Sequence, residues 1–235
     1  MKKRVALLLG AATMMAVALT GCGGGKSSDS GSASNGGDAG TTTADGGSSE
    51  AHKDTLVIGT DADINNLDLQ SQQDQINNIV LKNTHQTLVF FNNGSQGDER
   101  FGPCLATSWE QEDDTHIKMS LRDDVHFNDD DETPMTAEDV KFTLDMAMDN
   151  VGTTVLDDYT IEIETESYNN EFIQSLSSVP LSIQSKKAYE SGMEDPYYIG
   201  TGPYKFDEWV EGEYCRLKKV DDYWGNDLPA DDNLA

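Results

Sequence analysis

The feature that most constrains the fold is a clean alternation of apolar and polar side chains from Thr115 to Phe127. The apolar positions are Ile117, Met119, Leu121, Val125 and Phe127, and His116, Lys118 and Ser120 lie between them. Because successive side chains of a strand point to opposite faces, this pattern predicts a half-buried antiparallel strand over 115–127. The Asp113-Asp114 pair before it predicts a turn, which would pair this strand with Trp109–Glu112.

A capped helix is predicted directly after this strand. Thr136 is a favourable N-cap, and Asp139 three residues later forms a variant of the capping box. Glu138 and Asp139 also suit the positive end of the helix dipole. An apolar stripe then predicts a helix over 137–150 with one buried face, formed by Val140, Leu144, Ala147 and Met148.

Shorter patterns predict the remaining elements. TLVIGT at 55–60 indicates a buried strand, and the apolar spacing from Ile76 indicates a helix that ends near 85–88. Further predicted elements are a short strand LVFF before a turn at Asn93-Gly94, an alternating strand at 158–165, a short helix at 172–179, and a hairpin turning at Glu211-Gly212. No helix–strand alternation is long enough for a doubly wound sheet. The expected fold class is α/β with a mixed, mostly antiparallel sheet and flanking helices.

The first 51 residues are expected to lie outside the folded domain. Lys2, Lys3 and Arg4 precede an apolar run that is short for a membrane span but suits a signal-peptide core. Its end, Leu19-Thr20-Gly21-Cys22, resembles a bacterial lipobox, which implies cleavage after residue 21 and lipid attachment to Cys22. The alternative is an ordinary signal peptide with a chance cysteine. Residues 22–51, rich in Gly, Ser and Thr, predict a disordered tether.

Residues 52–235 suffice for one sizeable domain and are too few for two large lobes. The chain carries 16 Lys and Arg against 43 Asp and Glu, a net charge of −27. Such a surface repels nucleic acid and anionic lipid headgroups and weakly favours cationic ligands. Cys104 and Cys215 match no metal motif; a buried free thiol is the default for Cys104, and a disulfide between the two remains an alternative.

Three markers occur in an order that resembles the family 5 extracellular solute-binding proteins of ABC importers. They are the stretch LATSWE to TAEDV within 103–144, IGTGPY at 199–204, and DDYWGNDLP at 221–229. The resemblance implies the first lobe of a periplasmic-binding-protein type II fold, with IGTGPY carrying the chain back into the main sheet. It further implies a monomer that captures short peptides for a membrane permease without cofactor or catalysis, anchored outside the cell membrane, or in the periplasm where two membranes are present.

The sequence departs from the family pattern in three places. Several tens of residues are missing before the strand at 158–165, Asp130–Glu132 resembles a small insertion, and the chain stops at Ala235 where relatives continue to about twice the length. We therefore expect an N-terminal fragment without its second lobe, with exposed strand edges that reduce stability or promote aggregation.

The predicted ligand site is the loop after the first strand. By resemblance, Asp63, Ile64 and Asn65 face the cleft, where a carboxylate and free backbone groups suit an ammonium or an extended peptide. The alternative is a solvated polar loop.

Other chemistry has weaker support in the sequence. His85, His116 and His126 are not at metal-ligand spacing, the acidic run 129–132 lacks the Gly and distal Glu of a calcium loop, and Trp109, Trp209 and Trp224 suit packing better than sugar stacking. No hydrolase, zinc-protease or nucleotide-binding motif occurs. The alternatives left open are a binding protein for nickel or an oligosaccharide, a non-functional truncated surface lipoprotein, and an extracellular hydrolase.

Overall fold

The computed structural model describes residues 55–71, 74–95, 97–169 and 171–228. The chain divides into two units, Met1–Thr55 and Leu56–Ala235, and the fold described below is that of the second. The predicted signal segment, the tether and Cys22 lie outside the described residues.

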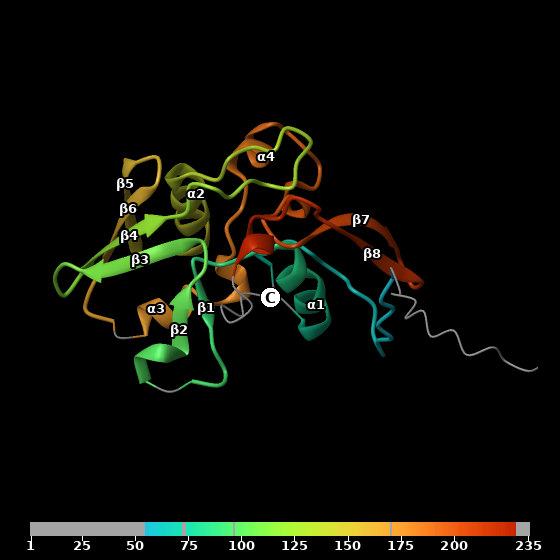
Figure 1. Cartoon of the computed structure of the whole chain (residues 1–235), viewed down its shortest axis with the longest axis horizontal. Helices are drawn as coiled ribbons and strands as arrows, with labels where there is room; N and C mark the ends of the chain where they lie inside the picture. Colours follow the sequence, from blue (N-terminus) through green and yellow to red (C-terminus); the bar gives the residue numbers. More distant parts are fainter. Residues whose placement is uncertain (1–54, 72–73, 96, 170, 229–235) are drawn as a thin grey trace, which may run out of the picture. The chain divides into compact units, whose positions relative to one another are not determined.

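Four antiparallel strands form the main sheet, in the spatial order β3-β4-β6-β5 (Figure 1). Their bounds are Ala106–Gln111 for β3, His116–Leu121 for β4, Val151–Asp157 for β5 and Thr160–Thr165 for β6. The register sets Ile117 opposite Ile163 and Met119 opposite Ile161, so that the alternating apolar side chains meet on one buried face. The predicted pairing of β3 with β4 across Asp113-Asp114 is confirmed.

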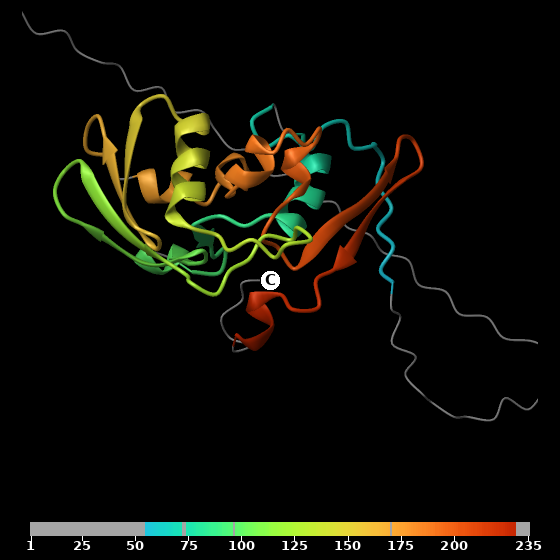
Figure 2. The ribbon, with the colours of Figure 1, turned by 90° about the horizontal axis from the view of Figure 1, so that it is seen from above.

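Helix α2, Ala137–Ala147, lies against the buried face of this sheet (Figure 2). Val140 and Leu144 are fully buried in the same core as the sheet isoleucines. The Asp139 carboxylate accepts a hydrogen bond from the Thr136 backbone N–H at 2.9 Å and another from the Thr136 hydroxyl at 3.1 Å, which confirms the predicted capping pair. The helix ends at Ala147 rather than at residue 150, because Asp149 and Asn150 form the turn into β5.

Helix α1, Gln75–Thr84, and the hairpin of β7, Tyr204–Val210, with β8, Tyr214–Lys219, enclose a second, smaller core. Short elements complete the described part of the chain. They are β1 Val89–Phe91, η1 Gly97–Arg100, β2 Phe101–Pro103, α3 Phe172–Ser175, η2 Val179–Leu181, α4 Lys186–Glu190, η3 Pro196–Tyr198 and η4 Trp224–Asp227. None of the helices in the described ranges is long and apolar enough to span a bilayer.

Two expectations about the sheets are wrong. The strand that follows IGTGPY pairs with β8 in a separate two-stranded sheet and does not join the main sheet. Every strand pair in the described residues is antiparallel, so the sheet is not mixed. The seven-residue strand β5 also escaped prediction, since VGTTVLD alternates only weakly between apolar and polar side chains.

The first predicted strand, TLVIGT, is neither a strand nor buried. Leu56, Val57 and Ile58 are 83%, 85% and 61% exposed. A strand exists only as part of a ladder, and this segment pairs with no strand among the described residues. Its apolar run therefore remains extended and open to solvent.

The predicted strand over 115–127 ends early, at Leu121. Arg122 and Asp124 form an ion pair at 2.6 Å within a bend that interrupts the ladder. Val125 and Phe127 are nevertheless buried, because the chain folds back through an isolated bridge between His126 and Pro134. The alternation therefore predicted burial correctly and strand continuity wrongly.

Two glycines of IGTGPY pack directly on the end of α1. The Gly202 N–H donates to the Thr84 carbonyl at 2.9 Å. A Cβ atom at position 200 would lie 2.1 Å from that same carbonyl oxygen, and one at position 202 would lie 2.6 Å from the Asn83 carbonyl oxygen. Only glycine permits this approach.

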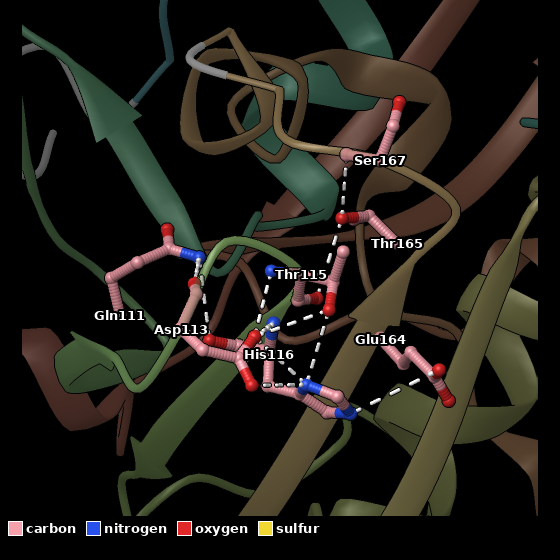
Figure 3. A network of polar contacts seen from close by, with 7 residues as sticks. All are labelled: Gln111, Asp113, Thr115, His116, Glu164, Thr165 and Ser167. Atoms are coloured by element: carbon pink, nitrogen blue, oxygen red, sulfur yellow. Dashed lines mark hydrogen bonds and ion pairs between the residues drawn. The ribbon is translucent and has the colours of Figure 1, made fainter.

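A polar network closes one end of the main sheet (Figure 3). Asp113 accepts hydrogen bonds from the backbone N–H groups of Thr115 at 2.8 Å and His116 at 2.9 Å, and its carboxylate lies 2.9 Å from His116 Nδ1. On the neighbouring strand, Glu164 lies 3.9 Å from His116 Nε2, and the Thr165 hydroxyl donates to the Thr115 carbonyl at 3.3 Å. The backbone donor of Thr115 lowers the pKa of Asp113, and the Asp113 carboxylate raises the pKa of His116.

Gly200→Ala should destabilise the domain by about 3 kcal/mol, because the carbonyl that the new Cβ meets belongs to the backbone and cannot rotate away. Urea denaturation measures the loss. Gly152→Ala in β5 is the matched control, since its Cβ would make ordinary contact at 3.6 Å with Glu164. Equal losses for the two variants would contradict the close-approach argument.

His116→Gln should destabilise the protein most at acidic pH. Folding raises the pKa of His116, so the protonated imidazole stabilises the folded state. This stabilisation is complete below the pKa of His116 in the unfolded chain, about 6.5, and is lost as the pH rises through its pKa in the folded protein. Melting temperatures of parent and variant between about pH 5 and pH 9 should therefore converge toward the alkaline end. His126→Gln, at an exposed position, is the control; a parent–variant gap that widens toward alkaline pH would refute the linkage.

Candidate functional site

The loop predicted to bind ligand runs along the smaller core. Ile64, Leu67 and Leu69 are buried there with Val80 and Leu81 of α1. The polar residues between these anchors are exposed or half-buried. The apolar residues therefore anchor the loop, and some of its polar residues remain accessible to solvent.

Asp63 contacts the tip of the β7–β8 hairpin. Its Oδ2 atom accepts a hydrogen bond from the backbone N–H of Gly212 at 2.5 Å. Gly212 has a φ of 75°, in the left-handed region that a tight hairpin turn demands. The side chain of Asp63 is exposed, and its second oxygen, Oδ1, has no hydrogen-bond partner within the described ranges.

Asn65 is engaged with α1 through both ends of its amide. Its Nδ2 donates to Asp74 at 2.7 Å, and its Oδ1 accepts from Asn77 Nδ2 at 2.9 Å. Its backbone N–H also donates to Asn77 Oδ1 at 3.2 Å. The Asn65 side chain therefore fixes the loop on the helix, where Asn77 is fully buried.

The three predicted residues thus share one loop but have different surroundings. Ile64 is 6% exposed and offers a ligand only its backbone. Asp63 presents an accessible carboxylate, and Asn65 a side chain already bonded within the protein. The contact between Asp63 and the hairpin was not foreseeable, because the two residues are 149 positions apart in sequence.

The histidines and acidic residues considered for metal binding lie in different settings. His85 is buried, its Nδ1 is 2.9 Å from the Thr84 hydroxyl, and burial lowers its pKa to about 4. In the acidic run 129–132, Asp131 pairs with Lys187 of α4 at 2.7 Å. Across the ranges that the structure describes, no three His, Cys, Asp or Glu side chains are grouped to hold a metal ion.

The two described cysteines are both free thiols. Cys104 is buried in the larger core, as predicted, and burial raises its pKa to about 12. Cys215 is half-buried beside the smaller core, and burial raises its pKa to about 11. The alternative of a disulfide between them is wrong in this structure, and both thiols are protonated and unreactive near neutral pH.

Comparison with known proteins places this geometry in a family. The model described as "Bacterial extracellular solute-binding proteins, family 5 Middle" matches residues 100–234. The glutathione-binding protein GsiB of Escherichia coli K12 is 28% identical over 196 residues, which cover 77% of this chain and 37% of that protein. The chain therefore spans little more than a third of the length of this relative.

Solved structures of binding proteins share the fold. DppA of Helicobacter pylori, in complex with the peptide STSA, is 27% identical with a TM-score of 0.59, over 68% of this chain and 38% of DppA. AgaA of A. tumefaciens R10, in complex with agropinic acid, is 25% identical with a TM-score of 0.59, over 67% of this chain and 34% of AgaA. These neighbours support the predicted type II periplasmic-binding-protein architecture, here as antiparallel sheets with flanking helices. The chain belongs to the family 5 extracellular solute-binding proteins.

Proposed function

We propose that this chain acts in solute capture for an ABC importer and that its ligand is a short peptide. The observation that carries the proposal is the likeness to a DppA structure that holds a tetrapeptide, at 27% identity. The family consists of substrate-binding transport proteins and not of enzymes, in keeping with the protonated thiols and the neutral, buried His85.

The mechanism that fits such a fold is closure of two lobes by hinge motion. In this proposal, the described residues supply the first lobe, a peptide bridges it to the second, and a membrane permease reads the closed state. The protein acts as a monomer, because each capture event needs one cleft and one ligand.

Asp63 is the proposed charged contact of the ligand. Its Oδ2 is occupied by the Gly212 N–H, while Oδ1 remains available to an ammonium group. Hydrogen bonds between charged partners contribute about 1.5–3 kcal/mol, more than neutral ones. Ile64 would add backbone groups, and Asn65 would hold the loop in place through Asp74 and Asn77.

The proposed attachment is a lipid on Cys22 at the outer face of the cell membrane. The sequence Leu19-Thr20-Gly21-Cys22 supports it, and the tether at 22–51 would span about 30 Å as a flexible coil. A body so tethered stays within reach of a permease.

Asp63→Asn should weaken binding of a tripeptide such as trialanine by about tenfold or more, since one charge-assisted contact is lost. The amide can still accept from Gly212, so the hairpin contact survives. Calorimetric titration of the protein expressed from its native gene measures the affinity, with glutathione and Ni²⁺ titrated in parallel. Asp61→Asn, two residues away on the same exposed segment, is the control. Binding of Ni²⁺ without binding of trialanine or glutathione would contradict the proposal.

Cys22→Ser should release the protein from the membrane fraction. A thioether-linked diacylglyceryl group cannot form on serine, so the variant lacks the acyl chains that would hold the protein on the membrane. Metabolic labelling with tritiated palmitate and cell fractionation measure the change. Retention of label in the variant would exclude Cys22 as the attachment site, whereas Cys104→Ser should leave labelling intact.

A further inference from the structure

Three segments that carry the family resemblance line one cavity. They are 124–128 after β4, Thr201 of IGTGPY, and 222–224 after the hairpin. Together with Glu132 and Lys205 they surround about 90 Å³. Where they converge, these segments form a concave polar surface.

The floor and wall of the cavity are held in place before any ligand arrives. Phe127 and Thr201 are buried at its floor. Tyr223 and Trp224 form the aromatic wall, and the side-chain amide of the buried Gln86 bonds to both. Its Nε2 donates to the Tyr223 hydroxyl at 2.6 Å, and its Oε1 accepts from Trp224 Nε1 at 2.9 Å. A wall so fixed loses little conformational entropy on binding.

Two of the nearby carboxylates are already neutralised. Asp124 pairs with Arg122 at 2.6 Å, and the same guanidinium lies 4.2 Å from the Trp224 ring centre. Asp129 accepts from the backbone N–H of Thr133 at 2.8 Å and lies 3.7 Å from Lys187. Asp124 and Asp129 therefore stabilise the structure around the cavity.

Three exposed charges of the lining remain unpaired. Within the described residues, the side chains of Glu132, Lys205 and Asp222 make no hydrogen bond or ion pair. The lining thus offers two negative charges and one positive charge to a ligand. A ligand that carries both an ammonium and a carboxylate group can pair with charges of both signs, whereas a ligand with a single charge leaves at least one of the three unpaired.

The floor carries a polar group that lacks a partner. Thr201 is 1% exposed, and its hydroxyl makes no hydrogen bond to any residue that the structure describes. A buried hydroxyl left in this way costs about 1–3 kcal/mol. Because a hydroxyl both donates and accepts, a polar ligand that reaches the floor would recover this cost.

We propose that this cavity binds a small zwitterion of the α-amino acid class. The ammonium group lies toward Glu132 and Asp222, the carboxylate toward Lys205, and the side chain against the aromatic wall. At about 90 Å³ the cavity has room for several water-sized groups, which suits a small ligand. This site is separate from the peptide loop at Asp63, and it does not depend on peptide capture.

Titration of the whole chain with L-alanine, n-propylamine and propionate, followed by calorimetry and by tryptophan fluorescence, tests the assignment. L-alanine should bind saturably and about tenfold or more tightly than either single-charge analogue. Propylamine binding as tightly as alanine, or no saturable alanine binding up to about 50 mM, would overturn the proposal.

Matched variants separate the two charges. Lys205→Met should weaken alanine binding about tenfold and leave propylamine binding unchanged or stronger, whereas Asp222→Asn should weaken both. Lys218→Met, on the same hairpin but outside the lining, should alter neither. Parent affinity for alanine in both cavity variants would refute the charge assignment.

Thr201→Val provides a readout that a structural role would not give. Removing an unpaired buried hydroxyl should leave thermal stability unchanged or raised, while alanine binding weakens several-fold. Loss of stability together with unchanged binding would assign Thr201 to the scaffold and overturn its place in the site.

Discussion

The approach of the IGTGPY backbone to the end of α1 joins the two halves of this domain. Gly202 donates to the Thr84 carbonyl at 2.9 Å. On the opposite side, Asn128 donates its backbone N–H to the Gly200 carbonyl at 2.8 Å and its side-chain amide to the Gly202 carbonyl at 3.0 Å. One short segment is thereby bonded to the helix of the smaller core and to the loop that leaves the main sheet. The contact with the helix does not tolerate a Cβ atom on either glycine, because it would meet the backbone of Asn83 or Thr84.

The chain carries a net charge of −27, and two of its carboxylates are held by local hydrogen bonds. Asp139, 6% exposed, accepts from the backbone N–H of Lys186 at 3.0 Å as well as from Thr136, and Asp113 accepts from two backbone N–H groups. Burial raises the pKa of Asp139, so its hydrogen bonds must offset a desolvation cost. Repulsion between the exposed carboxylates acts at the surface, where water and salt screen it.

Local patterns in the sequence predicted the parts of the fold that depend on local physics. The alternation at 116–121 predicted both the strand and its buried face, and the Thr136–Asp139 pair predicted where α2 begins. What failed depends on partners distant in sequence. TLVIGT has strand character but no ladder, and β7 begins as predicted but pairs away from the main sheet. The candidate site shows the same division, since the polar loop was predictable and the bond from Gly212 to Asp63 was not.

The β7–β8 hairpin is the element that both proposed sites share. At its tip, Gly212 bonds to Asp63 in the peptide loop, and near its base Lys205 lines the small cavity. The rest of the hairpin packs on the smaller core through Phe206, which stacks on Tyr198 with ring centres 3.9 Å apart. A ribbon anchored along its length can transmit a shift only if it has two discrete arrangements. Because the Gly212 N–H occupies only Oδ2 of Asp63, an ammonium group can bind Oδ1 without displacing the hairpin tip, so occupancy of the peptide loop leaves the position of Lys205 unchanged.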